Sequence, residues 1–296
     1  MNYNQMAKAL NRASVYFEYT KPRVWLLLVF VGGVGATLAA KTFGEYNLMM
    51  IFVAIVSLIA GSAGSEAITN YVDRDIDSIM NRTKNRPLVT GKIEPKKGLE
   101  LGIILIISSV LILLVFKRFL AFYFITAGII DNVVVYSYLL KRKTPWSIIL
   151  GGFSGGLPVI VGWYTLTSVF SILPWFLFTL IVVWIPIHIW SLAFRYKDDY
   201  RRAKVPMLPA VYPDGISAKC ISLSAILLVV FSVIPYYFGE NSFIYIFIVT
   251  IASIPMVLLA AMFVRMKDKK SSFRLFKYSS PYLTVIFLLF LILKFF

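Results

Sequence analysis

The sequence predicts an all-α membrane protein in which nine transmembrane helices form one bundle around a central cavity. Its 296 residues are 59% hydrophobic and 15% charged, with a mean hydropathy of +0.80, whereas soluble domains carry about 25% charged residues. The apolar residues fall into nine long segments, and the basic residues gather between alternate segments. Because nothing between the segments is long enough to fold alone, residues 1–296 are expected to form a single domain.

Each of the nine apolar segments is long enough to cross about 30 Å of hydrocarbon as a helix. In chain order they are residues 22–40, 48–71, 99–116, 119–139, 146–164, 170–192, 219–238, 242–264 and 279–295. The connections between them are short, which is typical of one helical bundle.

The basic residues predict the direction of the bundle. If the N-terminus is cytoplasmic and the C-terminus outside, the outer side holds only Lys41, Lys117, Arg118 and Lys294, which leaves 26 of the 30 Lys and Arg residues inside. Such an excess is the positive-inside pattern of a multi-pass protein of the cell membrane. The net charge of +16 is therefore assigned to cytoplasmic loops and anionic membrane lipid, not to nucleic acid.

A group of acidic residues directly follows the second apolar segment. On a continuing helix, Asp73 and Asp77 share one face while Asp75 points the opposite way. A hard divalent cation such as Mg²⁺ would remove the repulsion between the two carboxylates and keep positions open for phosphate. Arg82, Lys84 and Arg86 follow and add positive charge for the rest of an anionic ligand. A solvated, charge-balanced loop explains the same spacing equally well.

A second polar group follows the sixth segment on the same predicted side. It runs from Arg195 to Arg202 and contains Lys197, Asp198 and Asp199. We therefore expect the second and sixth helices to present acidic groups at one mouth of the cavity, on the cytoplasmic side. Lys141 and Arg142, after the fourth segment, face that side as well. Their side chains either anchor the helix end at the lipid headgroups or extend toward a bound diphosphate.

His188 is the only histidine in the chain and lies in an apolar helix a few residues before Asp198. A buried histidine is ordinarily a hydrogen-bonded core residue, and a ligand role is the alternative. Tyrosine and tryptophan near the ends of spans, such as Tyr136 and Trp163, are either interfacial anchors or cavity walls that face a carbocation.

The run Thr69-Asn-Tyr-Val-Asp73-Arg-Asp-Ile-Asp77, followed by Arg82-Thr-Lys-Asn-Arg-Pro-Leu, resembles the first aspartate-rich motif of the UbiA superfamily of intramembrane prenyltransferases. Within it the chain is most similar to the protoheme IX farnesyltransferases, and the resemblance covers about residues 20–210. Further matching stretches are Lys21-Pro22-Arg23, Tyr138-Leu-Leu-Lys-Arg, Gly151-Gly-Phe-Ser-Gly-Gly-Leu-Pro158 with Gly162-Trp163, His188-Ile-Trp-Ser-Leu, Tyr196-Lys-Asp-Asp-Tyr-Arg-Arg-Ala and Pro206-Met-Leu-Pro209.

Two positions depart from the superfamily pattern. The asparagine of the first motif is Thr69 here, with Asn70 beside it, and either side chain is a candidate for that role. Many relatives have two aspartates four residues apart in the second motif, whereas here Asp198 and Asp199 are adjacent and position 202 is arginine. We therefore expect a second metal site built from fewer carboxylates.

The resemblance implies transfer of a farnesyl group from farnesyl diphosphate to a vinyl group of protoheme IX (heme B), with addition of water, giving heme O. It implies Mg²⁺ as the cofactor and, as partners, membrane lipid together with heme A synthase or a terminal oxidase. The residues implied are catalytic Asn70, Asp73, Asp77 and Asp199; metal-binding Asp73, Asp77, Asp198 and Asp199; diphosphate-binding Arg23, Lys84, Arg86, Lys141, Arg142 and Lys197; and, for the heme, His188 and Trp163.

Two alternative functions are also compatible with the sequence. A related prenyltransferase acting on a quinone precursor or a glyceryl phosphate lipid would share the diphosphate half of the site, although His188 and the stretch from Tyr196 to Pro209 favour heme. A secondary transporter would carry its acids near mid-span, whereas the acids recognised here cluster at one face.

Overall fold

The computed structural model describes residues 12–44, 46–237 and 243–295. Residues 1–11, with Lys8 and the chain start, and Phe296 at the chain end lie outside the described residues. Within the described part, nine helices are long and apolar enough to cross a membrane, which confirms the predicted spans. They are α2 (Pro22–Phe43), α3 (Leu48–Val72), α5 (Pro95–Val115), α6 (Phe119–Ile130) continued by the π-helix η1 (Asp131–Leu140), α7 (Ser147–Leu150) with α8 (Phe153–Leu166), α9 (Ile172–Arg195), α12 (Asp214–Tyr237), α13 (Phe243–Met266) and α14 (Lys269–Phe295).

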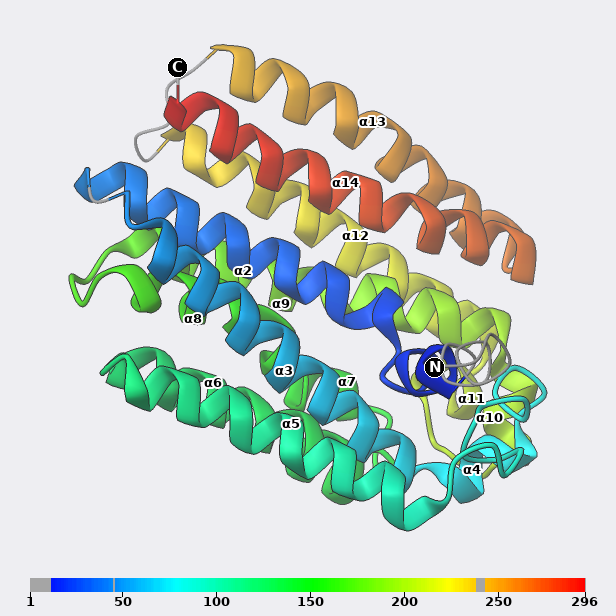
Figure 1. Ribbon diagram of the computed structural model, residues 1–296. Coiled ribbons are helices and arrows are strands. Elements are labelled where there is room, and N and C mark those ends of the chain that lie inside the picture. The colour runs from blue at the N-terminus through cyan, green and yellow to red at the C-terminus, as the bar shows by residue number, and fades with distance from the viewer. Residues whose placement is uncertain (1–11, 45, 238–242, 296) are drawn as a thin grey trace, which may run out of the picture.

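Three short helices lie in the connections between the spans: α4 (Arg74–Ile79), α10 (Lys197–Arg202) and α11 (Leu208–Val211). Residues 12–19, before α2, are helical as well. Figure 1 shows all three at one end of the bundle, where α2 begins, while α14 finishes at the opposite end. The helices that follow the second and sixth spans are thus brought to one end of the molecule, as the charge pattern predicts.

Some helix ends differ from the apolar segments. Helix α14 begins at Lys269, ten residues before its predicted start, because backbone hydrogen bonding continues through polar residues beyond the apolar stretch. The fifth span is broken between α7 and α8 at Gly151 and Gly152, where a hydropathy pattern shows only a continuous apolar run.

Helices α2 and α8 cross at glycines. A β-carbon on Gly162 would lie 1.9 Å from the backbone oxygen of Gly32, and one on Gly35 would lie 2.3 Å from that of Val159. Without β-carbons the two backbones touch, which is how small residues join membrane helices. This crossing holds α8 against α2, and other residues of both helices line the cavity.

We expect Gly162→Ala to destabilise the protein by about 1–3 kcal/mol, the usual cost of overpacking, because the new methyl group would collide with backbone that cannot rotate away. Thermal unfolding in detergent measures the effect. Gly33→Ala is the matched control, since nothing lies within 4 Å of its β-carbon position. It should leave the melting temperature unchanged or raise it, and equal destabilisation by both changes would contradict the crossing.

Candidate active site at one end of the bundle

The first acidic motif lies where α3 ends and α4 begins. Asp73 is the C-cap of α3, and the backbone N–H of Asp77 donates to the oxygen of Asp73 at 2.8 Å, so the helical turn continues across the junction. Asp73 and Asp77 are 2% and 4% exposed. Asp75 faces outward with 61% of its side chain exposed and accepts two hydrogen bonds of 2.7 Å from Arg142. The predicted phasing of the three carboxylates is confirmed.

Each buried carboxylate of this motif has a basic partner. Lys141 forms an ion pair with Oδ2 of Asp73, and Nη1 of Arg86 lies 2.5 Å from Oδ2 of Asp77. Burial by itself would lower the pKa of Lys141, but the carboxylate of Asp73 outweighs it and raises that pKa. Lys141 is therefore a permanent cation beside Asp73.

Thr69 and Asn70 face different neighbours. Asn70 accepts a hydrogen bond of 3.1 Å from Arg86 and donates one of 2.6 Å to the backbone oxygen of Tyr19, so it positions the arginine that pairs with Asp77. Thr69 instead accepts from Lys21 at 3.0 Å. The two candidates for the motif asparagine thus contact different cations.

The second motif meets the first through the turns after α4. Asp199, 7% exposed, accepts a hydrogen bond of 3.2 Å from the backbone N–H of Arg82 and pairs with Arg202. In the same turn, the hydroxyl of Thr83 donates to the backbone oxygen of Asp77 at 3.1 Å. Consecutive turn residues therefore connect the two acidic motifs, as the predicted shared mouth requires.

Five other predicted site residues lie elsewhere. Because neighbouring residues on a helix point in different directions, Asp198 cannot share the direction of Asp199, and it pairs with Lys269 at 2.5 Å. Lys197 pairs with Asp214 at 2.6 Å, and Trp163 packs edge-on against Phe43. The residues that line the cavity do not include Asp198, Lys197, Trp163, the exposed Lys84 or Arg142, which is engaged with Asp75.

A cavity of about 750 Å³ opens beside these motifs among α2, α3, α6, η1, α8, α9 and α14. Its charged lining is mainly basic: Lys21, Arg23, Arg82, Arg86 and Lys141, against Glu66 and Asp73. Asp77 and Asp199 stand just outside the lining, and each contacts an arginine that belongs to it. The balance of charge suits an anionic ligand.

The π-helix η1 determines which residues of the fourth span face the cavity. Asn132, Tyr136, Ser137 and Lys141 all line it. In an α-helix, nine residues make two and a half turns, so Asn132 and Lys141 would point in opposite directions. The wider i→i+5 turns of a π-helix return residue i+9 to nearly the same face, and such segments are frequent at functional sites.

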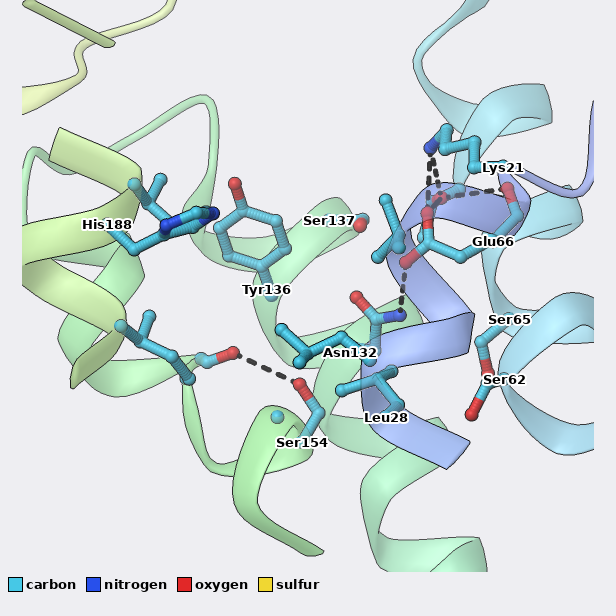
Figure 2. Close-up of a pocket in the computed structure, with 18 of the residues that line it drawn as sticks. Lys21, Leu28, Ser62, Ser65, Glu66, Asn132, Tyr136, Ser137, Ser154 and His188 are labelled. Atoms are coloured by element: carbon cyan, nitrogen blue, oxygen red, sulfur yellow. Dashed lines mark hydrogen bonds and ion pairs between the residues drawn. The ribbon is translucent and has the colours of Figure 1, made fainter. Parts of the chain in front are cut away.

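His188 forms part of the opposite wall, where Figure 2 shows its ring on the same side as Tyr136. It stacks between Trp184 and Phe276, with ring centroids 4.3 and 4.4 Å away. The hydroxyl of Ser279 lies 2.8 Å from the backbone oxygen of Phe276, to which it can donate, and 2.8 Å from Nδ1 of His188, so the tautomer with the proton on Nδ1 satisfies both contacts. Nε2 then carries the lone pair, which is the form that binds metals.

Two acidic residues inside the membrane spans, Glu66 and Asp131, belong to neither aspartate-rich motif and were not predicted as site residues. Glu66 lies in α3 and Asp131 opens η1, where its carboxylate accepts from the backbone N–H of Ser154 at 2.8 Å. A single acid inside an apolar run was the available signal, because ionisable residues within spans are costly and usually functional. The partner of Glu66, Lys21, is 45 positions away in the chain and gives no local signal.

The donor set suits a hard divalent cation. Oδ1 of Asp73 is buried and has no hydrogen-bond partner among the described residues, so one carboxylate oxygen remains available as a ligand. No three acidic, histidine or cysteine side chains of the described part converge closely enough to hold an ion by themselves. Mg²⁺ is characteristically held by one or two carboxylates and completed by substrate phosphates and water.

The chain matches the UbiA prenyltransferase family over residues 26–291. It is 57% identical to a protein named protoheme IX farnesyltransferase from Thermoplasma volcanium, covering 97% of this chain and 99% of that relative. It is 54% identical to the one from Thermoplasma acidophilum, with 96% and 99% covered.

Solved structures share the fold. A digeranylgeranylglyceryl phosphate synthase superposes with a TM-score of 0.77 at 18% identity, over 96% of this chain and 99% of that one. A UbiA homologue from Archaeoglobus fulgidus bound to GPP and Mg²⁺ superposes with a TM-score of 0.68 at 17% identity, over 95% and 98%. With its membrane-spanning bundle and aspartate-rich motifs at one end, the chain therefore belongs to the UbiA prenyltransferase family.

Proposed function

We propose that this protein transfers the farnesyl group of farnesyl diphosphate to a vinyl group of protoheme IX, with addition of water, to give heme O and diphosphate. Relatives named for this reaction match nearly the whole chain at more than half identity. His188, in the wall opposite the acidic motifs, is the observation that carries the choice of acceptor.

The part of the site that would bind farnesyl diphosphate, the prenyl donor, is the end of the cavity lined by basic residues. Lys141, Arg86 and Arg82 would contact the diphosphate, with Lys21 and Arg23 completing the positive lining. Asp73, Asp77 and Asp199 are the carboxylates that would hold Mg²⁺, and the free Oδ1 of Asp73 supports this. When bound, Mg²⁺ supplies Lewis-acid stabilisation of the leaving diphosphate.

The acceptor half is the aromatic wall. Protoheme IX would lie against Trp184 and Phe276 with its iron toward Nε2 of His188, in the tautomer in which Nδ1 donates its proton to Ser279. As the bond between C1 and the diphosphate oxygen breaks, Lys141 and Arg86 stabilise the charge that develops on the leaving group. The ring of Tyr136, which lines the same cavity, faces the allylic cation.

Other acceptors remain the competing proposal within the family. The diphosphate half would be common to enzymes acting on quinone precursors or glyceryl phosphate lipids, and the structural likeness to a glyceryl lipid synthase at 18% identity concerns the fold alone. A histidine prepared to bind iron has no evident use with those acceptors. We also propose that the protein lies in the cell membrane with the mouth on the cytoplasmic side, and that heme O passes to heme A synthase or a terminal oxidase.

Expression in a host that lacks heme O provides the test. The extracted heme is expected to gain the mass of one farnesyl group and one water, measured by mass spectrometry, and an Asp73→Ala variant should yield only protoheme. No farnesylated heme from a well-inserted protein would overturn the proposal. Prenylation of a quinone precursor or a glyceryl lipid in its place would support the competing acceptors.

A further inference from the structure

Glu66 is a carboxylate in the cavity that the transfer of the farnesyl group itself does not use. It lies seven residues before Asp73 on α3, about two turns or 10 Å deeper than the acidic mouth and on the same helical face. Its Oε2 is 2.9 Å from Nζ of Lys21, and its Oε1 has a contact of 3.4 Å with Nδ2 of Asn132. Figure 2 shows this group facing the cavity.

The polar groups around Glu66 have hydrogen-bonding capacity to spare. The contact of Oε1 with Asn132 is long, so that oxygen can accept a stronger hydrogen bond. The hydroxyl of Ser137, on the same face of η1 as Asn132, is buried without a partner among the described residues. A site that is polar, lined by several such groups and open to a cavity suits an ordered water molecule.

Building on the proposed function, we infer that Glu66 is a catalytic residue that accepts a proton from the water added to the heme vinyl group. The vinyl π electrons form the bond to C1 of the farnesyl chain as the C1–O bond breaks, and the inner vinyl carbon becomes cationic. A lone pair of the water oxygen then bonds to that carbon. One water proton passes to Glu66 and later to solvent or diphosphate, and the hydroxyl group remains on the product.

Lys21 and Asn132 keep Glu66 ready for this step. The ammonium group beside Oε2 favours the ionised carboxylate, which is the form that can receive a proton. Asn132 contacts the other oxygen, and η1 holds Asn132 on the cavity face. An ion pair serving stability alone would not need an oxygen turned toward a cavity, and buried ion pairs are weak evidence for stability.

The test is the ratio of two products, measured by mass spectrometry with membranes, protoheme, farnesyl diphosphate and ¹⁸O-labelled water. If the water is not deprotonated, the cation loses a proton from carbon and gives an alkene lighter than the alcohol by one water. In Glu66→Gln the rate of labelled alcohol formation should fall by about 10²-fold, in the range for loss of a general base. The alkene should then become the main farnesylated product.

Lys21→Gln is the matched control, because it breaks the same ion pair and keeps the carboxylate. It should slow turnover and preserve the share of alcohol. Glu66→Asp, which keeps a carboxylate that is one methylene shorter, should give an intermediate share and serves if the glutamine variant fails to insert. A wild-type alcohol share in Glu66→Gln, or an equal shift in Lys21→Gln, would overturn the inference. Absence of both products from the wild type would instead refute the proposed function.

Discussion

Asp73→Asn is expected to lower the rate of farnesyl transfer by about 10³-fold, the upper range for removing one group that stabilises developing charge. The change removes the carboxylate with the free buried oxygen and the partner of Lys141. The rate is measured in membranes with protoheme and farnesyl diphosphate and is normalised to the amount of inserted protein. Asp77→Asn is expected to have a comparable effect, because Asp77 shares the buried face and holds Arg86.

Asp75→Asn is the matched control, since it makes the same chemical change two residues away on the exposed side. It should reduce the rate by no more than a few-fold, because an exposed ion pair contributes about 1 kcal/mol or less. A loss at position 75 as large as that at position 73 would contradict the assignment of the two faces.

Folding has to be separated from catalysis in this series. Removing one partner of a buried ion pair typically costs about 3–5 kcal/mol, so Asp73→Asn leaves Lys141 as an uncompensated buried cation. The double variant Asp73→Asn with Lys141→Met removes both charges and should recover much of the lost stability in detergent unfolding. It should remain inactive, and recovery of activity with stability would show that the pair has only a structural role.

Deleting Val134 is expected to abolish most activity, by about 10²-fold or more, the cost of misplacing a catalytic group by roughly 1 Å. Val134 is an exposed residue inside η1, and removing one residue lets the segment close into α-helical turns. Asn132 and Lys141 would then be eight α-helical residues apart, about 80° around the helix axis, so they would no longer lie on one face. The transfer rate and the thermal unfolding of the purified protein are measured side by side.

Two controls isolate the π-helix. Val134→Ala changes the side chain and keeps the residue count, so its activity should be close to that of the wild type. Deletion of Val134 combined with insertion of one glycine after Lys143 restores the chain length beyond the span without restoring the wide turns, and should stay inactive. Full activity in this combined variant would show that loop length, and not the face presented by η1, controls the site.

Local periodicity was sufficient for the first motif. Asp73, Asp75 and Asp77 follow from a helical repeat that continues through the junction of α3 and α4, and short-range hydrogen bonds such as that from Asp77 to Asp73 maintain it. The nine spans and the gathering of both acidic motifs at one end likewise follow from apolar length and alternation of charge.

Local periodicity did not predict which residues of the second motif and of the fourth span face the site. Spacing alone cannot show which of Asp198 and Asp199 reaches the first motif. Asp198 forms an ion pair with Lys269, whereas Asp199 accepts a hydrogen bond from the backbone N–H of Arg82. An apolar run of about twenty residues has the same hydropathy in α-helical and π-helical form, so the face of η1 that meets the cavity could not be deduced. The position of Trp163 could not be deduced either. It packs against Phe43 away from the cavity, because an aromatic residue in a span packs wherever the neighbouring helices leave room.

By itself the sequence determined a nine-span membrane bundle and a pair of carboxylates on one helical face beside basic residues, because hydrophobic length, charge alternation and helical repeat are properties of neighbouring positions. Only the tertiary structure decided that Asp199 meets the loop after Asp77, that Lys21 reaches Glu66 across 45 positions and that His188 lines the cavity with Nδ1 against Ser279. These are contacts between segments that are distant in the chain. They depend on how closely the helices approach and on the hydrogen-bonding groups that the neighbouring helices supply.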